Sequence, residues 1–140
     1  MDIQIATLCD FAADYNGKLV ISGTIDVLAA PNLPIVQPQC CLAIRLCITP
    51  EDNGPHKFSV NIIDSDGHSL DEKMPIEADM PIEIPDEVPF VTRNLILNLQ
   101  GLRFQETGVY FVDISIDDEL VQRLPLRVVQ MEQKHPNQKA

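Results

Sequence analysis

Residues 3–28, IQIATLCDFAADYNGKLVISGTIDVL, carry the clearest folding signal in the chain, an Asn-Gly pair between two apolar runs. Asn16 and Gly17 both accept the positive φ angles of a type I′ turn, so the stretch predicts a β-hairpin with a two-residue loop. The turn also sets the register, because each residue before it faces one after it. The predicted opposite pairs are Tyr15 with Lys18, Ala12 with Ile21, Leu8 with Ile25, and Ala6 with Val27.

The same register places Asp10 opposite Gly23, on the apolar face of the hairpin. A carboxylate buried there costs free energy unless it is hydrogen-bonded or the ladder is distorted. We therefore expect a β-bulge near Cys9 and Asp10 that turns the carboxylate outward or onto backbone N–H groups. A polar site built around Asp10 is the alternative. Bends at Cys9–Asp10 and at Gly23 would let this long hairpin serve both sheets of a sandwich.

Length and charge restrict the class of protein. A chain of 140 residues fits one domain with its own core. The net charge of −11 repels nucleic acid and anionic membrane surfaces, so we expect neither as a partner. The first residues, MDIQIATLCD, lack a basic signal-peptide region, and no stretch is long and apolar enough to span a bilayer. We expect a cytoplasmic protein.

The cysteines predict a reducing environment. None of them forms a CxxC pair, and the adjacent Cys40 and Cys41 would point to opposite faces of a strand. We interpret them as small buried hydrophobic residues. A zinc site or a disulfide framework is the alternative. The four residues are Cys9, Cys40, Cys41 and Cys47.

The rest of the chain alternates apolar and polar residues in short segments separated by Gly, Pro and Asx turns, with no helical period. This pattern predicts an all-β fold, a two-sheet antiparallel β-sandwich of about eight or nine strands in residues 1–129. Residues 130–140, QMEQKHPNQKA, are expected to form a disordered polar tail. The strands expected after the hairpin are residues 40–49, 57–64, 74–85 and 90–99, closed by Gly101, and a final pair that turns at Asp117-Asp118 and contains Pro125.

Residues 74–85, MPIEADMPIEIP, predict an edge strand. Their apolar residues alternate strictly with prolines and acidic residues. Pro75, Pro81 and Pro85 are all odd-numbered, so their missing N–H donors lie on one side of the strand. That side can remain unpaired, guarded by proline and carboxylates against association with other sheets.

Several short motifs, taken in their order along the chain, resemble those of an uncharacterised bacterial family. Its members are small single-domain proteins described only as a domain of unknown function. The motifs are ATLCDFAAD, GKLVISG, a P-x-x-P loop, the DSDG turn, and the closing GVYFVDISID with LPLRV. The closing segment also resembles the last hairpin of immunoglobulin-like sandwiches, in which a Gly-x-Tyr entry to a strand is common. The resemblance implies a sandwich and assigns no activity.

No catalytic signature is recognisable. His56, His68 and His135 lack metal-binding spacing, and the glycines are too scattered for a phosphate loop. We therefore expect no enzyme and no cofactor. Acidic loop residues leave calcium as an alternative, because Asp-rich loops gather oxygen ligands in C2-like sandwiches. The calcium candidates are Asp64, Asp66, Asp113 and Asp117.

Apolar residues at nominally outward positions favour an interaction module. Such residues mark a docking surface when they form a patch. The chain is therefore expected to bind a protein partner, or itself as a homo-oligomer, through a sheet face. The candidate interface residues are Val20, Ile63, Ile96 and Phe111.

Overall fold

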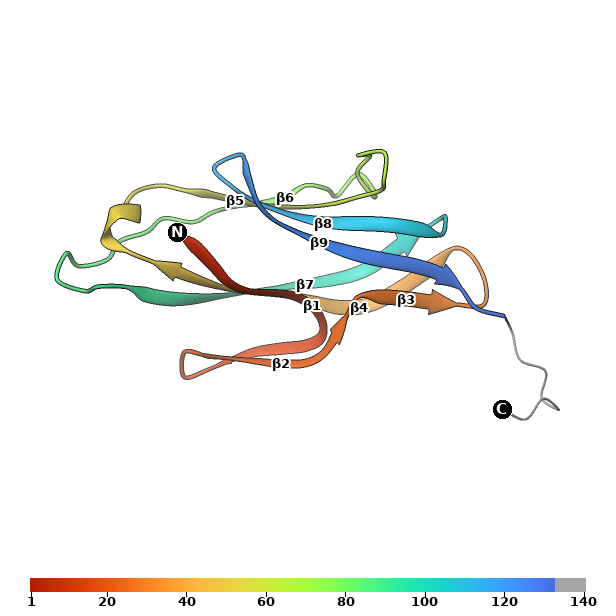
Figure 1. Ribbon diagram of the computed structural model, residues 1–140, viewed down its shortest axis with the longest axis horizontal. Coiled ribbons are helices and arrows are strands. Elements are labelled where there is room, and N and C mark those ends of the chain that lie inside the picture. Colours follow the sequence, from red (N-terminus) through yellow and green to blue (C-terminus); the bar gives the residue numbers. More distant parts are fainter. Residues whose placement is uncertain (133–140) are drawn as a thin grey trace.

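Nine β-strands form two packed sheets in the computed structural model, which describes residues 1–132 (Figure 1). The four-stranded sheet has the order β2-β1-β4-β7 and the five-stranded sheet the order β3-β9-β8-β5-β6. The predicted all-β sandwich is confirmed. The strands are β1 (Asp2–Tyr15), β2 (Lys18–Ile25), β3 (Val27–Ala30), β4 (Ile35–Ile48), β5 (Lys57–Ile63), β6 (Ile76–Asp79), β7 (Val91–Phe104), β8 (Gly108–Ile116) and β9 (Glu119–Gln130), with a 3-10 turn at Pro50–Asp52.

Strand alternation builds the core between the two sheets. The even-numbered residues of β8, and those of β4 from Cys40 onward, point inward because side chains alternate along a strand. Six of them are completely buried: Leu42, Ile44, Leu46, Ile48, Val112 and Ile114. The inward residues of β5 face them, and they include Val60 and Ile62.

The hairpin register is confirmed near the turn. Tyr15 faces Lys18, Ala12 faces Ile21 and Leu8 faces Ile25. The predicted pairing of Ala6 with Val27 is wrong. Val27 belongs to β3, which crosses to the other sheet and runs parallel to β9, whereas every other strand pair is antiparallel.

The predicted bulge at Cys9–Asp10 is wrong, because the hairpin register is continuous on both sides of Asp10. Cys9 faces Thr24 and Phe11 faces Ser22. The irregularity is instead in the backbone of Gly23, whose φ of +69° is left-handed. Asp10 is exposed, as expected.

The strand β1 bends after Cys9, where its pairing with β4 ends. Its second half and β2 turn back beneath β4 and β7 and form a third layer (Figure 1). This layer covers a second, smaller cluster of buried side chains, with Leu19, Ile21 and Ile96 at its margin. The cluster consists of Cys9, Ala12, Cys41 and Ala43.

The edge strand is confirmed, and its open side is the predicted one. The backbone N–H groups of Met80 and Ile82 donate to the carbonyls of His56 (2.8 Å) and Gly54 (2.9 Å). Even-numbered amides therefore face the sheet, which leaves the three odd-numbered prolines on the open side. The regular strand is shorter than predicted, and only β6 belongs to the ladder.

Several boundaries differ from the prediction. Gly101 does not end its strand, because a φ of +63° lets β7 continue to Phe104. The strand β9 continues to Gln130, into the predicted tail, and the Met131 N–H donates to the carbonyl of Ala30 (2.9 Å). The remainder of that predicted disordered tail, residues 133–140, lies outside the described residues. Within residues 1–132, no helix is long and apolar enough to cross a lipid bilayer.

Tyr110 fixes the corner at which the chain crosses from β7 to β8. Its hydroxyl donates to the carbonyl of Glu106 (2.8 Å), and its ring meets Phe104 edge-on, with centroids 4.9 Å apart. Burial raises the pKa of Tyr110, so the hydroxyl keeps its proton and remains a donor.

Candidate functional site

The four calcium candidates do not form one site. Asp64 and Asp66 follow the last residue of β5, whereas Asp117 lies beside Lys57, the first residue of that strand. Asp113 lies between these ends, opposite Asn61. The strand thus separates the two loops.

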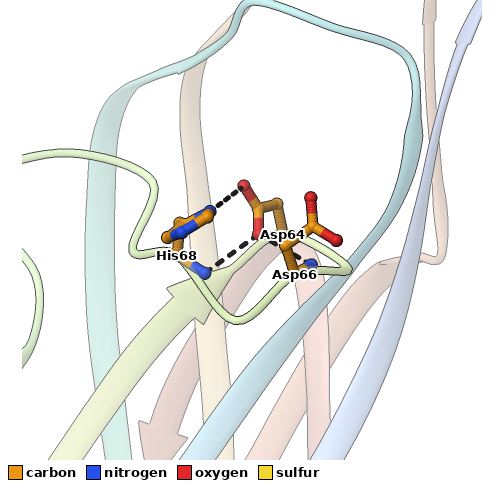
Figure 2. A group of neighbouring side chains, drawn as sticks. All are labelled: Asp64, Asp66 and His68. Carbon is orange, nitrogen blue, oxygen red and sulfur yellow. Dashed lines mark hydrogen bonds and ion pairs between the residues drawn. The ribbon is translucent and has the colours of Figure 1, made fainter.

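Asp64 organises its own turn (Figure 2). Its Oδ1 accepts the backbone N–H groups of Asp66 and His68, each at 2.9 Å. These bonds lower the pKa of Asp64, and the bond from the His68 N–H has the largest effect. Partial desolvation acts in the opposite direction but is outweighed. The His68 Nδ1 lies 3.5 Å from Oδ2, and the three side chains offer ligand atoms within 4.8 Å of one another. Two carboxylates fall well short of the six to eight oxygens that calcium takes.

Asp113 is held by an arginine. Nε and Nη2 of Arg123 donate to its two oxygens at 2.7 and 2.8 Å. The guanidinium also lies 5.1 Å from the centroid of the Phe111 ring, within reach of a cation–π contact. Asp113 therefore belongs to a side-chain pair on the outer surface of the five-stranded sheet.

Asp117 binds a histidine that the sequence did not single out. The imidazole of His56 places Nδ1 2.6 Å from Oδ2 of Asp117 and Nε2 2.6 Å from the carbonyl of Asp52. Both ring nitrogens face acceptors, so both donate only when the ring is protonated. The pKa of His56 is raised, first by Asp117, and the pKa of Asp117 is lowered by the same contact. The two residues lie 61 positions apart, so no local pattern could have paired them.

Stability should fall above neutral pH because of this contact. A histidine whose pKa is higher in the folded state than in the unfolded state contributes to the free energy of unfolding. This contribution is fully present below the unfolded-state pKa of about 6.5, and it is lost as the pH rises through the folded-state pKa. Between about pH 6 and pH 9, we expect the melting temperature to fall more for the wild type than for His56→Gln. The control, His68→Gln, changes a 77% exposed ring and should follow the wild type. Parallel curves for wild type and His56→Gln would contradict this role.

The four interface candidates lie on three different surfaces. Ile63 and Phe111 are cross-strand neighbours on the outer side of the five-stranded sheet. Ile96 lies against the second cluster, under the folded hairpin. Val20 is 44% exposed on the far side of that hairpin. They do not form a single patch.

Val20 belongs to a larger apolar surface, which we call the hairpin face. Phe11 and Tyr15 lie on the same side of β1 and are 56% and 65% exposed. Val20 faces Ala13 between them. Neither aromatic residue was among the predicted interface residues, although the predicted register places both on the side of Val20. The hairpin face consists of Phe11, Ala13, Tyr15, Lys18, Val20 and Ser22.

Polar contacts at the tip fix the hairpin on the sheet. Arg45 of β4 donates to the carbonyl of Gly17 (2.9 Å) and to Oδ1 of Asn94 (2.7 Å). The Nδ2 of Asn94 donates in turn to Asp14 (2.8 Å). The pKa of Asp14 is lowered most by a hydrogen bond from the backbone N–H of Gly17, and next by the bond from the Asn94 amide. The Asp14 carboxylate therefore stays ionised and accepts both bonds. The hairpin face is thus held in one orientation.

The strand order defines the class of protein. In immunoglobulin-type sandwiches, strands A, B and E adjoin in one sheet and C, F and G in the other, and a tyrosine at the E–F corner bonds back to the backbone. Here β1, β4 and β7 adjoin in one sheet, β5, β8 and β9 in the other, and Tyr110 lies at the β7–β8 corner. The protein is an immunoglobulin-like β-sandwich.

The chain belongs to a family of unknown function, DUF6941, whose model matches residues 4–129. A search of curated proteins found no match. Among solved structures, the chain is similar to an immunoglobulin-like protein from Pseudomonas aeruginosa, with 13% identity and a TM-score of 0.40. That match covers 91% of this chain and 95% of the other.

Proposed function

We propose that this protein is a non-enzymatic interaction module that binds a protein partner through the hairpin face. The exposure of Phe11, Tyr15 and Val20 on one side of a fixed hairpin carries the proposal. Aromatic residues are enriched in protein interfaces, and Tyr supplies much contact area at a small cost in side-chain entropy. A cytoplasmic setting is part of the proposal, supported by four free cysteines.

The hairpin face is suited to docking for a structural reason. Its residues project away from the sandwich, because the opposite side of the hairpin packs on the second cluster. Removing an exposed aromatic side chain there costs little folding stability, since it is not part of a core. Function and stability can therefore be separated by mutation.

The test is affinity capture with the full chain from lysate of its source organism, followed by direct titration of the captured protein. We expect Phe11→Ser with Tyr15→Ser to weaken binding at least about tenfold, because central aromatic residues dominate such interfaces. The matched control is Val109→Ser. Val109 is an apolar residue as exposed as Val20, at 44%, but it lies outside the hairpin face. Equal binding by both variants, or no captured protein at all, would overturn the proposal.

A calcium-binding function is the second candidate, and the grouping of Asp64, Asp66 and His68 favours it. If the protein acts through the hairpin face and does not bind calcium, calorimetric titration at about millimolar calcium should give no saturable heat. The melting temperature should not change either. A saturable heat that Asp66→Ala abolishes would support the calcium site instead. Asp113→Asn serves as the control, because Asp113 is remote from the turn.

A further inference from the structure

The lateral edges of the two sheets are protected unequally. In the five-stranded sheet, prolines guard the open side of the edge strand β6, and the other edge strand, β3, is only four residues long. The strand β2 is eight residues long and carries the left-handed Gly23. In contrast, β7 has 14 residues without proline, and within residues 1–132 it pairs along its length with β4 alone. A long unguarded edge is a template for pairing with another strand.

The exposed edge of β7 carries a palindromic sequence. Residues 94–98 read Asn-Leu-Ile-Leu-Asn in both directions. The regular part of the strand extends from Val91 to Gly101. At Gly101 the positive φ breaks the alternation of side chains, so the buried residues are odd-numbered before it (Leu99) and even-numbered after it (Leu102). Ile96 is five residues from each end, so the palindrome and the regular strand have the same centre.

We propose that β7 pairs antiparallel with β7 of a second copy of this chain, about a two-fold axis at Ile96. A two-fold interface must match itself, and a palindromic strand does so residue by residue. Ile96 would face its own counterpart, and Leu95 would face Leu97 of the second copy. The two four-stranded sheets would join into one continuous sheet of eight strands.

Side-chain chemistry fits this register. The arginine on this segment, Arg93, would lie opposite Leu99 of the second copy, so no like charges face each other. Leu95 and Leu97 are partly buried against the main core, and Ile96 against the second cluster. Pairing would extend both apolar clusters across the axis and cover the remaining exposed parts of these side chains.

This inference goes beyond the proposed function and is independent of it. The hairpin face and the β7 edge share no residue, so Phe11→Ser with Tyr15→Ser should leave self-association unchanged. A dimer that survives this double variant but loses the captured protein separates the two surfaces. Loss of the dimer in the same variant would place self-association on the hairpin face and overturn the inference.

The first experiment is sedimentation equilibrium of the full chain across salt concentrations. We expect a dimer that strengthens as salt rises, because salt screens the repulsion between two copies that each carry a net charge of −11. A strict monomer at about 100 μM would overturn the inference. A monomer that instead binds basic peptides, more weakly as salt rises, would also overturn it, because the edge would then serve a different partner.

The decisive experiment places opposite charges at the centre. Ile96→Glu and Ile96→Lys should each be monomeric, because each puts two like charges face to face on the axis. An equimolar mixture should form a heterodimer, with an affinity at least about tenfold above that of either variant alone. Failure of the folded variants to associate on mixing, or a heterodimer no tighter than the single variants, would overturn the register.

A measurement on the unmodified chain keeps the inference testable if either variant fails to fold. Amide hydrogen exchange at low and high protein concentration should show alternate amides of residues 91–101 becoming protected in the dimer. The amides of β2, also at an edge, provide the internal control and should not change. Exchange in β7 that is independent of concentration would overturn the inference.

Discussion

Replacing Gly23 with alanine is expected to lower the free energy of unfolding by about 2–3 kcal/mol. The backbone φ of +69° is left-handed, which costs a residue with a Cβ about 1–2 kcal/mol. An added Cβ would also lie 2.5 Å from Oδ2 of Asp10, so the exposed carboxylate must rotate away, at a further cost of up to about 1 kcal/mol. Urea denaturation monitored by circular dichroism measures the loss.

Gly17→Ala is the matched control for Gly23→Ala. Gly17 also has a left-handed φ, +81°, but within residues 1–132 nothing beyond its own chain neighbours lies within 4 Å of an added Cβ. Its cost should be the conformational one alone, about 1–2 kcal/mol. In an Asp10→Gly background, Gly23→Ala should cost about as much as Gly17→Ala, since the carboxylate is gone. Equal losses for the two glycines in the wild-type background would contradict the role of Asp10.

Replacing Arg45 with methionine is expected to cost about 2–3 kcal/mol and to loosen the hairpin. Arg45 donates from Nη1 to Gly17 and Asn94 and from Nη2 to Oγ1 of Thr92 (2.8 Å). Methionine has similar length and no donor, so these acceptors lose their charged partner. Arg123→Met is the control, because the Arg123 side chain is 46% exposed and solvent screens its pair with Asp113, so its loss should cost clearly less.

Thiol reactivity reports whether the hairpin has left the sheet. Cys9 and Cys41 are buried beneath it, at 0% and 2% exposure. Burial raises the pKa of Cys9, and it raises the pKa of Cys40 to about 11, so thiolates are scarce in the native state. With an aromatic disulfide reagent, wild type should react first at Cys47, the one partly exposed cysteine of the four, and Arg45→Met should gain fast reaction at Cys9 and Cys41. Unchanged labelling in that variant would show that other contacts hold the hairpin.

Local signals in the sequence predicted local features of the fold. Asn16-Gly17 fixed the hairpin register because the turn type leaves one pairing, and the prolines of residues 74–85 identified an open side because N–H directions alternate. Pro125 lacks an N–H donor and so predicts that the last strand is partly an edge or bulged. The strand is partly an edge, since β3 pairs with Arg127–Gln130 of β9 alone.

Features that depend on distant segments were not predictable in this way. The calcium candidates were grouped by residue type, but their separation follows from β5 extending between the two loops. The contact of His56 with Asp117 and the folding of the hairpin over the four-stranded sheet also depend on tertiary placement. The aromatic residues of the hairpin face were within reach, because the predicted register already placed them beside Val20.

The parallel pairing of β3 with β9 has a consequence for synthesis of the chain on the ribosome. Val27 pairs with Arg127, and within residues 1–132 β3 has no other neighbouring strand. The strands of the four-stranded sheet are complete once Phe104 has been made, but β3 waits for β9, and the pair of β5 with β6 waits for β8 to join it to the rest of its sheet. The inner apolar face of the first sheet therefore stays uncovered until the last strands emerge. Such late, long-range closure is slow, and the nascent chain is a candidate for chaperone binding until β9 emerges.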